Sequence, residues 1–145
     1  MYESIRLHPS SPTAVRRPTA PTELFGRGLA VDDEIVVNLH AANRDTAVFG
    51  DDAATFNPHR NASRLTSLSG LSFGTGMHAC IGRNLAAGAE PRPDTQPDEH
   101  HYGTIPLVLR ALLDHGVRPD PDDTARADTT TVRKTWAYYP ILLNP

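Results

Sequence analysis

The only cysteine of this 145-residue chain, Cys80, lies in the glycine-rich stretch SFGTGMHACIGR, directly before a segment of helical character. A cysteine binds metals as the thiolate, and exposed amide groups at the start of a helix stabilise that negative charge. A zinc site needs four ligands, usually nitrogen or sulfur, which one cysteine cannot supply. Haem iron takes four nitrogens from its porphyrin, so a single protein thiolate is sufficient. The sequence around Cys80 therefore favours a haem ligand over a zinc ligand.

The residues around Cys80 fit a flat ligand better than they fit the other roles of a cysteine. Gly74, Gly76 and Gly82 permit sharp turns and a close approach of the backbone, and Phe73 would shield the sulfur from water. A buried structural thiol is the commonest role of a free cysteine and is the alternative at this point. A nucleophilic cysteine needs a spatially paired histidine, and His78 is too near along the chain to be a comfortable base. The glycine spacing also differs from a dinucleotide-binding fingerprint.

The composition argues against several classes of protein. A formal net charge of −3 disfavours a general nucleic-acid-binding protein, which would carry a basic stripe. No run of about eighteen apolar residues is present, so we expect no membrane-spanning segment. The first residues lack the basic and apolar regions of a signal peptide, and one cysteine excludes an internal disulfide. We expect a cytoplasmic protein that has neither a membrane nor a nucleic acid as its partner.

The thirteen prolines divide the chain into short elements. Pro9 and Pro12 should end a helix that begins almost at Met1, and β-branched residues after them are typical of strands. The expected order in the first half is a helix (2–8), strands (13–17 and within 22–40), an irregular connection (41–60) and a shaped loop (64–80).

The second half is expected to contain two helices and a strand-rich end. Pro91 should stop the first helix, Thr104 should cap the second, and Gly116 should terminate it. The expected ranges are helices at 81–90 and 104–115, polar loops or disorder at 91–103 and 118–128, and strands at 129–145. Together these elements predict the α+β class.

Four segments resemble one known family. The stretch FGTGMHACIG matches the cysteine-ligand loop F-x-x-G-x-x-x-C-x-G of the cytochrome P-450 superfamily, the haem-thiolate monooxygenases, through Phe73, Gly76, Cys80 and Gly82. Upstream, Glu3-Ser4-Ile5-Arg6 resembles the E-x-x-R helix, and Phe56-Asn57-Pro58-His59-Arg60 resembles the later F-x-P-x-R segment. The stretch AANRDTAVFGDDAATFNPHR is similar to the soluble bacterial branch of the family.

The resemblance implies a haem site with named residues. Cys80 would be the axial ligand of the iron in haem b, and Arg16 and His78 would bind the haem propionates. Phe73, Gly74, Gly76 and Gly82 would shape the loop against the porphyrin. Glu3, Arg6 and Arg60 would form a structural ion network that holds this loop in place.

The resemblance also implies an activity and an incomplete fold. Residues 1–145 would be the C-terminal haem-binding portion of a mainly α family fold, truncated, with 91–103 as an inserted loop and 117–145 as a strand-rich tail. The complete family fold inserts one oxygen atom from O2 into a small organic substrate. Its electrons would come from a ferredoxin or flavodoxin-type donor, for which Arg64 and Arg83 are candidate contacts. The long helix that crosses the distal haem face has no counterpart in this sequence.

Other functions stay open beside the monooxygenase. The predicted helix at 105–115 has an apolar face around Leu109 and Leu112 that nothing in the chain would cover, and such a face is typical of an interface. A partner chain would then dock on it. The alternatives are a stand-alone haem-binding or interaction module and an inactive remnant that lacks the elements for oxygen activation.

Overall fold

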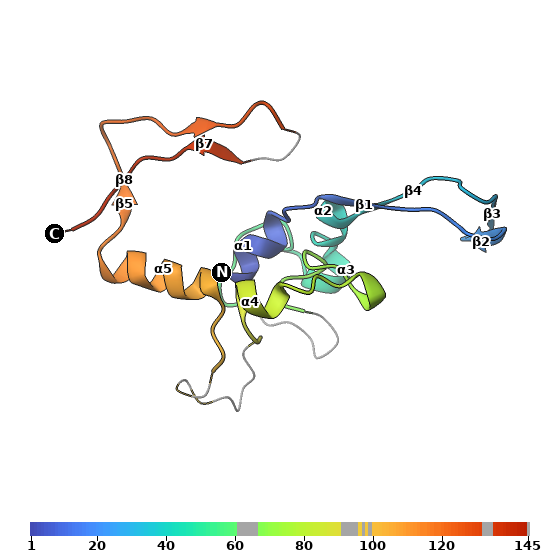
Figure 1. Ribbon diagram of the computed structural model, residues 1–145, viewed down its shortest axis with the longest axis horizontal. Helices are drawn as coiled ribbons and strands as arrows, with labels where there is room; N and C mark the ends of the chain where they lie inside the picture. Colours follow the sequence, from blue (N-terminus) through green and yellow to red (C-terminus); the bar gives the residue numbers. More distant parts are fainter. Residues whose placement is uncertain (61–66, 91–95, 97, 99, 132–134, 145) are drawn as a thin grey trace.

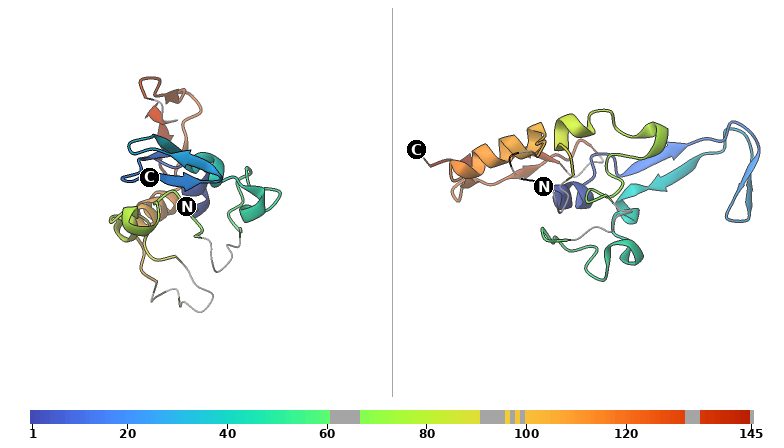
Figure 2. Two further views of the ribbon diagram at one scale, coloured as in Figure 1. Left: turned by 90° about the vertical axis from the view of Figure 1, so that its right-hand side faces the viewer. Right: turned by 90° about the horizontal axis from the view of Figure 1, so that it is seen from below.

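A computed structural model describes residues 1–60, 67–90, 96, 98, 100–131 and 135–144. Short helices and loops gather in the middle of the molecule, and two narrow β ribbons extend from them in different directions (Figure 1). The view from below shows the same elongated arrangement, with the first ribbon at one end of the molecule and α5 near the other (Figure 2).

Helix α1 (Tyr2–Leu7) lies in this central cluster and confirms the helix predicted near the N-terminus. Its buried side chains are Glu3, Arg6 and Leu7, so it presents mostly charged groups to the interior. The amide of His8 closes the helix by donating to Ser4 O at 2.8 Å. Burying two charges is costly unless they are paired, so α1 requires partners from elsewhere in the chain.

The first ribbon follows α1 and contains the predicted strands. Strand β1 (Thr13–Arg16) pairs antiparallel with β4 (Ile35–Asn38), and β2 (Thr22–Leu24) pairs with β3 (Arg27–Leu29). Phe25 and Gly26 form the two-residue turn at the tip with φ of 51° and 77°, the left-handed values that a tight hairpin turn requires.

Two short helices, α2 (Leu39–Ala42) and α3 (Thr46–Phe49), occupy part of the segment expected to be irregular. That prediction was wrong over these residues. Asn38 caps α2 by accepting from the Ala41 amide, and Asp45 caps α3 by accepting from the Ala47 amide. These caps satisfy helix-end amides in helices too short to show a periodic pattern.

Between residues 67 and 80, the described part of the predicted loop, the chain forms one 3-10 turn, η1 (Gly76–His78), and then leads into α4 (Arg83–Ala87). The helix expected to run as far as Pro91 ends earlier, because Gly88 has a φ of 78°. Residues 88–89 then lie against the returning chain, with a bridge to Tyr102 and a hydrogen bond from Ala89 N to His101 O of 2.9 Å. The insertion predicted at 91–103 falls largely outside the described residues.

Helix α5 (Thr104–Asp114) confirms the second predicted helix, and Gly116 follows its end with a left-handed φ of 62°. The predicted cap is wrong, because the N-cap residue is Gly103. The Thr104 hydroxyl donates instead to Leu85 O in α4 at 3.2 Å. This bond ties the two helices together where the chain returns.

The second ribbon is made by the last part of the chain. Strand β5 (Arg118–Pro119) pairs with β8 (Ile141–Leu142), and β6 (Arg126–Ala127) pairs with β7 (Trp136–Tyr138). Residues 118–128 were expected to be loop or disorder, and the strands within them correct that prediction. All four sheets in the described part of the chain are two-stranded, and the α+β class stays a prediction.

The interior of the described chain is small and largely polar. The buried apolar residues are Leu7, Leu39, Ala53 and Ala87, and the buried polar residues are Glu3, Arg6, Asn43 and Ser69. Hydrogen bonds between polar side chains, more than apolar packing, therefore hold the centre of the molecule together.

Candidate functional site

The Cys80 loop is closed by backbone hydrogen bonds. The Cys80 amide donates to Phe73 O at 2.7 Å, and the Ala79 amide donates to Gly76 O at 3.1 Å. After the cysteine, the Arg83 amide donates to Cys80 O at 3.2 Å and starts α4. The Cys80 side chain is exposed. The loop thus presents the thiol at the surface, at the point where a turn meets a helix.

Two glycines in this loop adopt conformations that other residues rarely adopt. Gly74 and Gly76 have φ of 67° and 62°. A Cβ on Gly74 would lie 2.9 Å from His78 O, whereas a Cβ on Gly76 would meet no atom within 4 Å. Gly82 lies close to the sulfur: a Cβ built on it would be 3.8 Å from Cys80 Sγ. Gly74 is therefore required by the fold of the loop, and Gly76 opens space beside it.

The other predicted haem contacts come from different parts of the chain. Phe73 is half-buried at the start of the loop, and His78 is exposed at the end of η1. Arg16 is exposed at the end of β1, opposite Ile35, and its guanidinium donates to the neighbouring carbonyl of Val15 at 2.8 Å. Strand β1 and the Cys80 loop lie on the same side of α1 (Figure 1). Nothing in the described contacts joins Arg16 directly to His78.

Glu3, Arg6 and Arg60 come together in the interior. Arg6 makes a two-pronged pair with Glu3, in which Nε and Nη2 each lie 2.7 Å from a carboxylate oxygen. Arg60 Nε lies 3.0 Å from Glu3 Oε1, and its Nη1 lies 2.7 Å from Asp52 Oδ1. Two carboxylates and two guanidiniums thus form one chain of charge-assisted hydrogen bonds.

The network lowers the pKa of its carboxylates. Burial alone would raise the pKa of Glu3, but hydrogen bonds from Arg6, the Asn57 amide and Arg60 outweigh it and lower the pKa from 4.5 to about 2. Hydrogen bonds from Arg60 and Asn57 also lower the pKa of Asp52. Glu3 is therefore fully ionised at neutral pH and acts as a fixed structural anion.

Two residues of these contacts were not identified from the sequence, the buried Asn43 and the exposed Asp52. Asn43 is fully buried and bonds both to α1 and to the chain that leads to Cys80. Asp52 extends the ion network through Arg60. Both lie in the stretch AANRDTAVFGDD, and an Asn or Asp there is as common in turns as in a core, so the residue type alone gave no signal.

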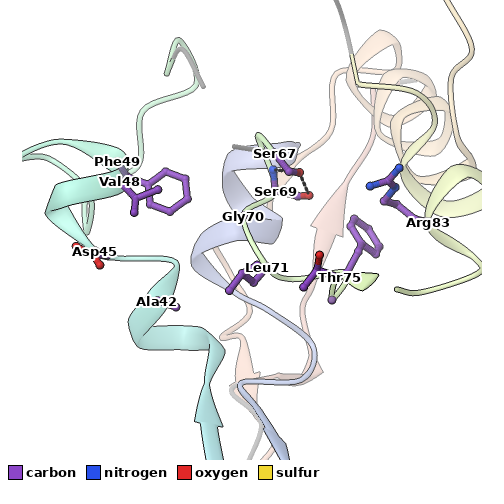
Figure 3. Close-up of a pocket in the computed structure, with 12 residues that line it drawn as sticks. Ala42, Asp45, Val48, Phe49, Ser67, Ser69, Gly70, Leu71, Thr75 and Arg83 are labelled. Atoms are coloured by element: carbon purple, nitrogen blue, oxygen red, sulfur yellow. Dashed lines mark hydrogen bonds between the residues drawn. The ribbon is translucent and has the colours of Figure 1, made fainter. Parts of the chain in front are cut away.

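A cavity of about 390 Å³ lies between the α2–α3 segment and the loop that leads to Cys80. In Figure 3, Asp45 and Phe49 stand on one side, the Ser67–Leu71 segment lies in the middle, and Arg83 stands on the other side. The lining residues are Ala42, Asp45, Val48, Phe49, Ser67, Ser69, Gly70, Leu71, Phe73, Gly74, Thr75 and Arg83. The cavity therefore has two aromatic rings and one charge of each sign in its walls.

A comparison with protein families decides the relationship of the chain. The model of the family described as Cytochrome P450 matches residues 1–88, which is more than half of the chain. The chain belongs to the cytochrome P450 family. Members of this family bind haem b, the iron protoporphyrin IX cofactor. The matched residues include α1, the ion network and the Cys80 loop.

Curated cytochromes P450 resemble this chain over a small part of their own length. Cytochrome P450 734A5 of Oryza sativa subsp. japonica is 34% identical over 92 residues, which cover 59% of this chain and 17% of that protein. The self-sufficient cytochrome P450 monooxygenase CYP505E4 of Penicillium freii is 41% identical over 91 residues, which cover 59% of this chain and 9% of that protein.

Solved P450 structures match almost the whole chain. The crystal structure of CalO2 aligns with a TM-score of 0.70 and 27% identity, over 99% of this chain and 32% of CalO2. A mutant of P450 EryK in complex with erythromycin B aligns with a TM-score of 0.69 and 26% identity, over the same shares of the two chains. The chain thus corresponds to about a third of a P450 fold. Its described helices include none that is long and apolar enough to cross a membrane.

Proposed function

We propose that this chain is the haem-ligand portion of a P450 monooxygenase and that Cys80 would hold the haem iron through its thiolate. The observation that carries the proposal is the Cys80 loop, in which left-handed glycines and the bond from Cys80 N to Phe73 O present an exposed thiol. Family membership makes this the best interpretation of such a loop.

The residues of the loop fit a haem group. Cys80 supplies one exposed sulfur, which is sufficient because the porphyrin supplies the remaining nitrogens. The space beside Gly76 is open, and Gly82 leaves the sulfur free of a neighbouring side chain. Phe73 and Gly74 would line the same face. Bound haem would supply the chemistry that activates O2 and inserts one oxygen atom into a small organic substrate.

The remaining site residues would hold and orient the cofactor. Arg16 is exposed and always charged, so it could pair with a propionate carboxylate, and His78, at the end of η1, would also bind a propionate. The Glu3–Arg6–Arg60 network ties α1 to the residues that follow α3, and it would support the loop through α1.

Oxygen chemistry would require the rest of a P450 fold around this portion. The chain aligns with 32% of CalO2, and a haem face without a protein wall would admit water and competing reactions. We therefore assign the monooxygenase activity to a complete or complemented form, in the cytoplasm.

The electron donor is proposed to be a ferredoxin or flavodoxin-type protein that docks near Arg83, an exposed residue at the start of α4. Arg64, the other candidate contact, lies outside the described residues. Arg83→Glu should slow electron transfer from such a donor, because it reverses the charge beside the Cys80 loop. Arg110→Glu on α5, where the side chain is 73% exposed, is the matched control. Equal rates in both variants would refute the docking site.

One observation favours a second function, an interaction module. Helix α5 exposes a series of apolar side chains, among them Leu107 at 52% and Leu113 at 68%. Such a face is typical of a surface that binds another protein. An inactive remnant is the third interpretation, and stoichiometric haem binding would argue against it.

The carbon monoxide difference spectrum of the reduced, haem-reconstituted chain tests the main proposal. A strongly red-shifted Soret band is expected in the native chain and should be lost in Cys80→Ala. Met77→Ala, which removes a side chain that is 93% exposed in the same loop, should keep the band. Unchanged haem binding and an unchanged band in Cys80→Ala would exclude Cys80 as the ligand.

A further inference from the structure

Asn43 lies at the junction between α1 and the chain that leads to Cys80. Its side chain is fully buried. The amide nitrogen Nδ2 donates to Arg6 O and to Ser72 Oγ, both at 2.9 Å, and the amide oxygen Oδ1 accepts from the Leu71 amide at 2.7 Å. Its own backbone carbonyl accepts from Arg6 Nη1. One residue thus uses both ends of its amide to join two segments.

The chain around Gly70 is shaped to receive this amide. Gly70 has a φ of 59°, and a Cβ built on it would collide with Asn43 Oδ1 and lie 2.9 Å from Asn43 Cγ. Only a glycine satisfies both the left-handed backbone and the close approach. The loop therefore wraps directly over the Asn43 side chain.

The held segment continues straight into the Cys80 turn. Ser72, which accepts from Asn43, donates to Ile5 O in α1 at 2.8 Å. The next residue is Phe73, whose carbonyl accepts the Cys80 amide at 2.7 Å. Any displacement of residues 71–72 from α1 would move that carbonyl and hence the backbone that carries the thiol.

We propose that Asn43 is a positioning residue for the Cys80 loop, which fixes residues 71–72 to the Arg6 end of α1 and thereby sets the place of the thiol. The proposal rests on the proposed function, because the position of the thiol matters for function only if Cys80 is the haem ligand. Asn43 touches no reacting atom and acts only through the loop.

The test compares Asn43→Ala with Asn38→Ala in the full chain. Asn38 also uses its side-chain oxygen, to cap α2. Its loss therefore weakens the same short helix that ends at Asn43, without removing a bond to residues 71–72. Asn43→Ala should accelerate hydrogen exchange of the Leu71 amide about tenfold or more, and that of the Cys80 amide several-fold, because a buried bond is lost. Asn38→Ala should leave both amides unchanged.

The carbon monoxide spectrum gives a second readout that a general loss of stability would not move. At equal haem content, Asn43→Ala should transfer intensity from the red-shifted thiolate band to the band of neutral ligation, and Asn38→Ala should not. If the native chain shows no red-shifted band, the assignment of Cys80 fails, and the amide exchange rates still decide the role of Asn43.

Two glycine substitutions, Gly70→Ala and its control Gly26→Ala, test the proposal if Asn43→Ala does not fold. Gly70→Ala forces a Cβ onto Asn43 and should reproduce the faster exchange of the Cys80 amide. Gly26→Ala carries a similar left-handed strain, with a φ of 77°, but meets no atom within 4 Å, and should leave that amide unchanged. Native exchange at Cys80 in both Asn43→Ala and Gly70→Ala, or equal acceleration in the matched controls, would overturn the proposal.

Discussion

The central junction, made by α1, residues 43–60 and the Cys80 loop, differs sharply from the region of α5 and the second ribbon. In the junction, charged and amide side chains are buried, and each finds partners far along the sequence, as when Arg60 reaches Glu3 across 57 positions. In the α5 region most apolar side chains are exposed, and the strands pair only two by two. The junction is held by its own buried contacts, and α5 carries an apolar face that the described part of the chain leaves exposed.

The two regions differ in how strongly their contacts specify one structure. A buried polar network specifies one arrangement, because any other leaves charges without partners. An exposed apolar helix specifies little until something packs on it. The Cys80 thiol therefore belongs to the central junction, the region whose structure is specified by buried polar contacts.

Among the substitutions that test this comparison, Arg6→Ala should cause the largest loss of unfolding free energy. It removes a guanidinium with 0% exposure and leaves Glu3 with fewer partners, which should cost about 3–5 kcal/mol of unfolding free energy. Denaturant unfolding followed by circular dichroism measures the loss. Arg110→Ala, whose 4.0 Å pair with Asp114 is exposed, should cost less than about 0.5 kcal/mol. Similar losses of unfolding free energy in the two variants would show that the buried network of the junction is no more important for stability than an exposed ion pair on α5.

Acid should weaken the junction through Glu3. Its pKa falls from 4.5 in the unfolded chain to about 2 in the folded chain, so the folded state binds the proton less readily. The stability that this gives is present above pH 4.5 and is lost as the pH falls towards 2, a change of about 3 kcal/mol.

Unfolding free energies measured across that pH range check the prediction. Glu3→Gln cannot titrate and should lack this part of the pH dependence, although it is less stable at neutral pH. If the slope in acid is the same in Glu3→Gln and in the native chain, the stabilising carboxylate is another group.

Thr104→Val should have a smaller effect at the border of the two regions. It removes the bond of 3.2 Å from the Thr104 hydroxyl to Leu85 O, which should cost about 0.5–1 kcal/mol. Thr104→Ser keeps the hydroxyl and serves as the control in the same thermal unfolding measurement. A loss in Thr104→Val no greater than in Thr104→Ser would show that the bond does not help to hold α5 on α4.

Local features of the fold were predictable because their causes are local. Pro9 follows α1 closely, and Gly116 follows α5 in the left-handed conformation that a helix end favours. The pairing of Glu3 with Arg6 follows from a spacing of three on a helix. The loop residues around Cys80 could be named from the sequence because the glycine and cysteine spacing is unusual.

Features that depend on distant contacts were missed. Thr104 is a residue type that often caps helices, but Gly103 takes the cap position of α5. A Cβ built on Gly103 would collide with backbone atoms of Ala86 and Gly88, so only a glycine fits there. Helix α4 ends at Gly88, where a left-handed φ of 78° and a bridge to the returning Tyr102 stop it. The glycine was a local signal for this end, but the prediction placed the stop at Pro91. Asn43 gave no signal, since its partners lie 28 to 37 positions away. Arg60 was identified only through the family resemblance.

The smallest effect on stability is expected on the exposed face of α5. Leu109 and Leu113 lie four apart on one face and are 41% and 68% exposed. Replacing both by lysine should change the unfolding free energy, measured by denaturant unfolding, by less than about 0.5 kcal/mol. Leu7→Lys, at a site that is 4% exposed, is the contrast and should unfold the junction. A loss above about 2 kcal/mol in the α5 variant would mean that the chain packs this face itself, and the two regions would then differ in degree and not in kind.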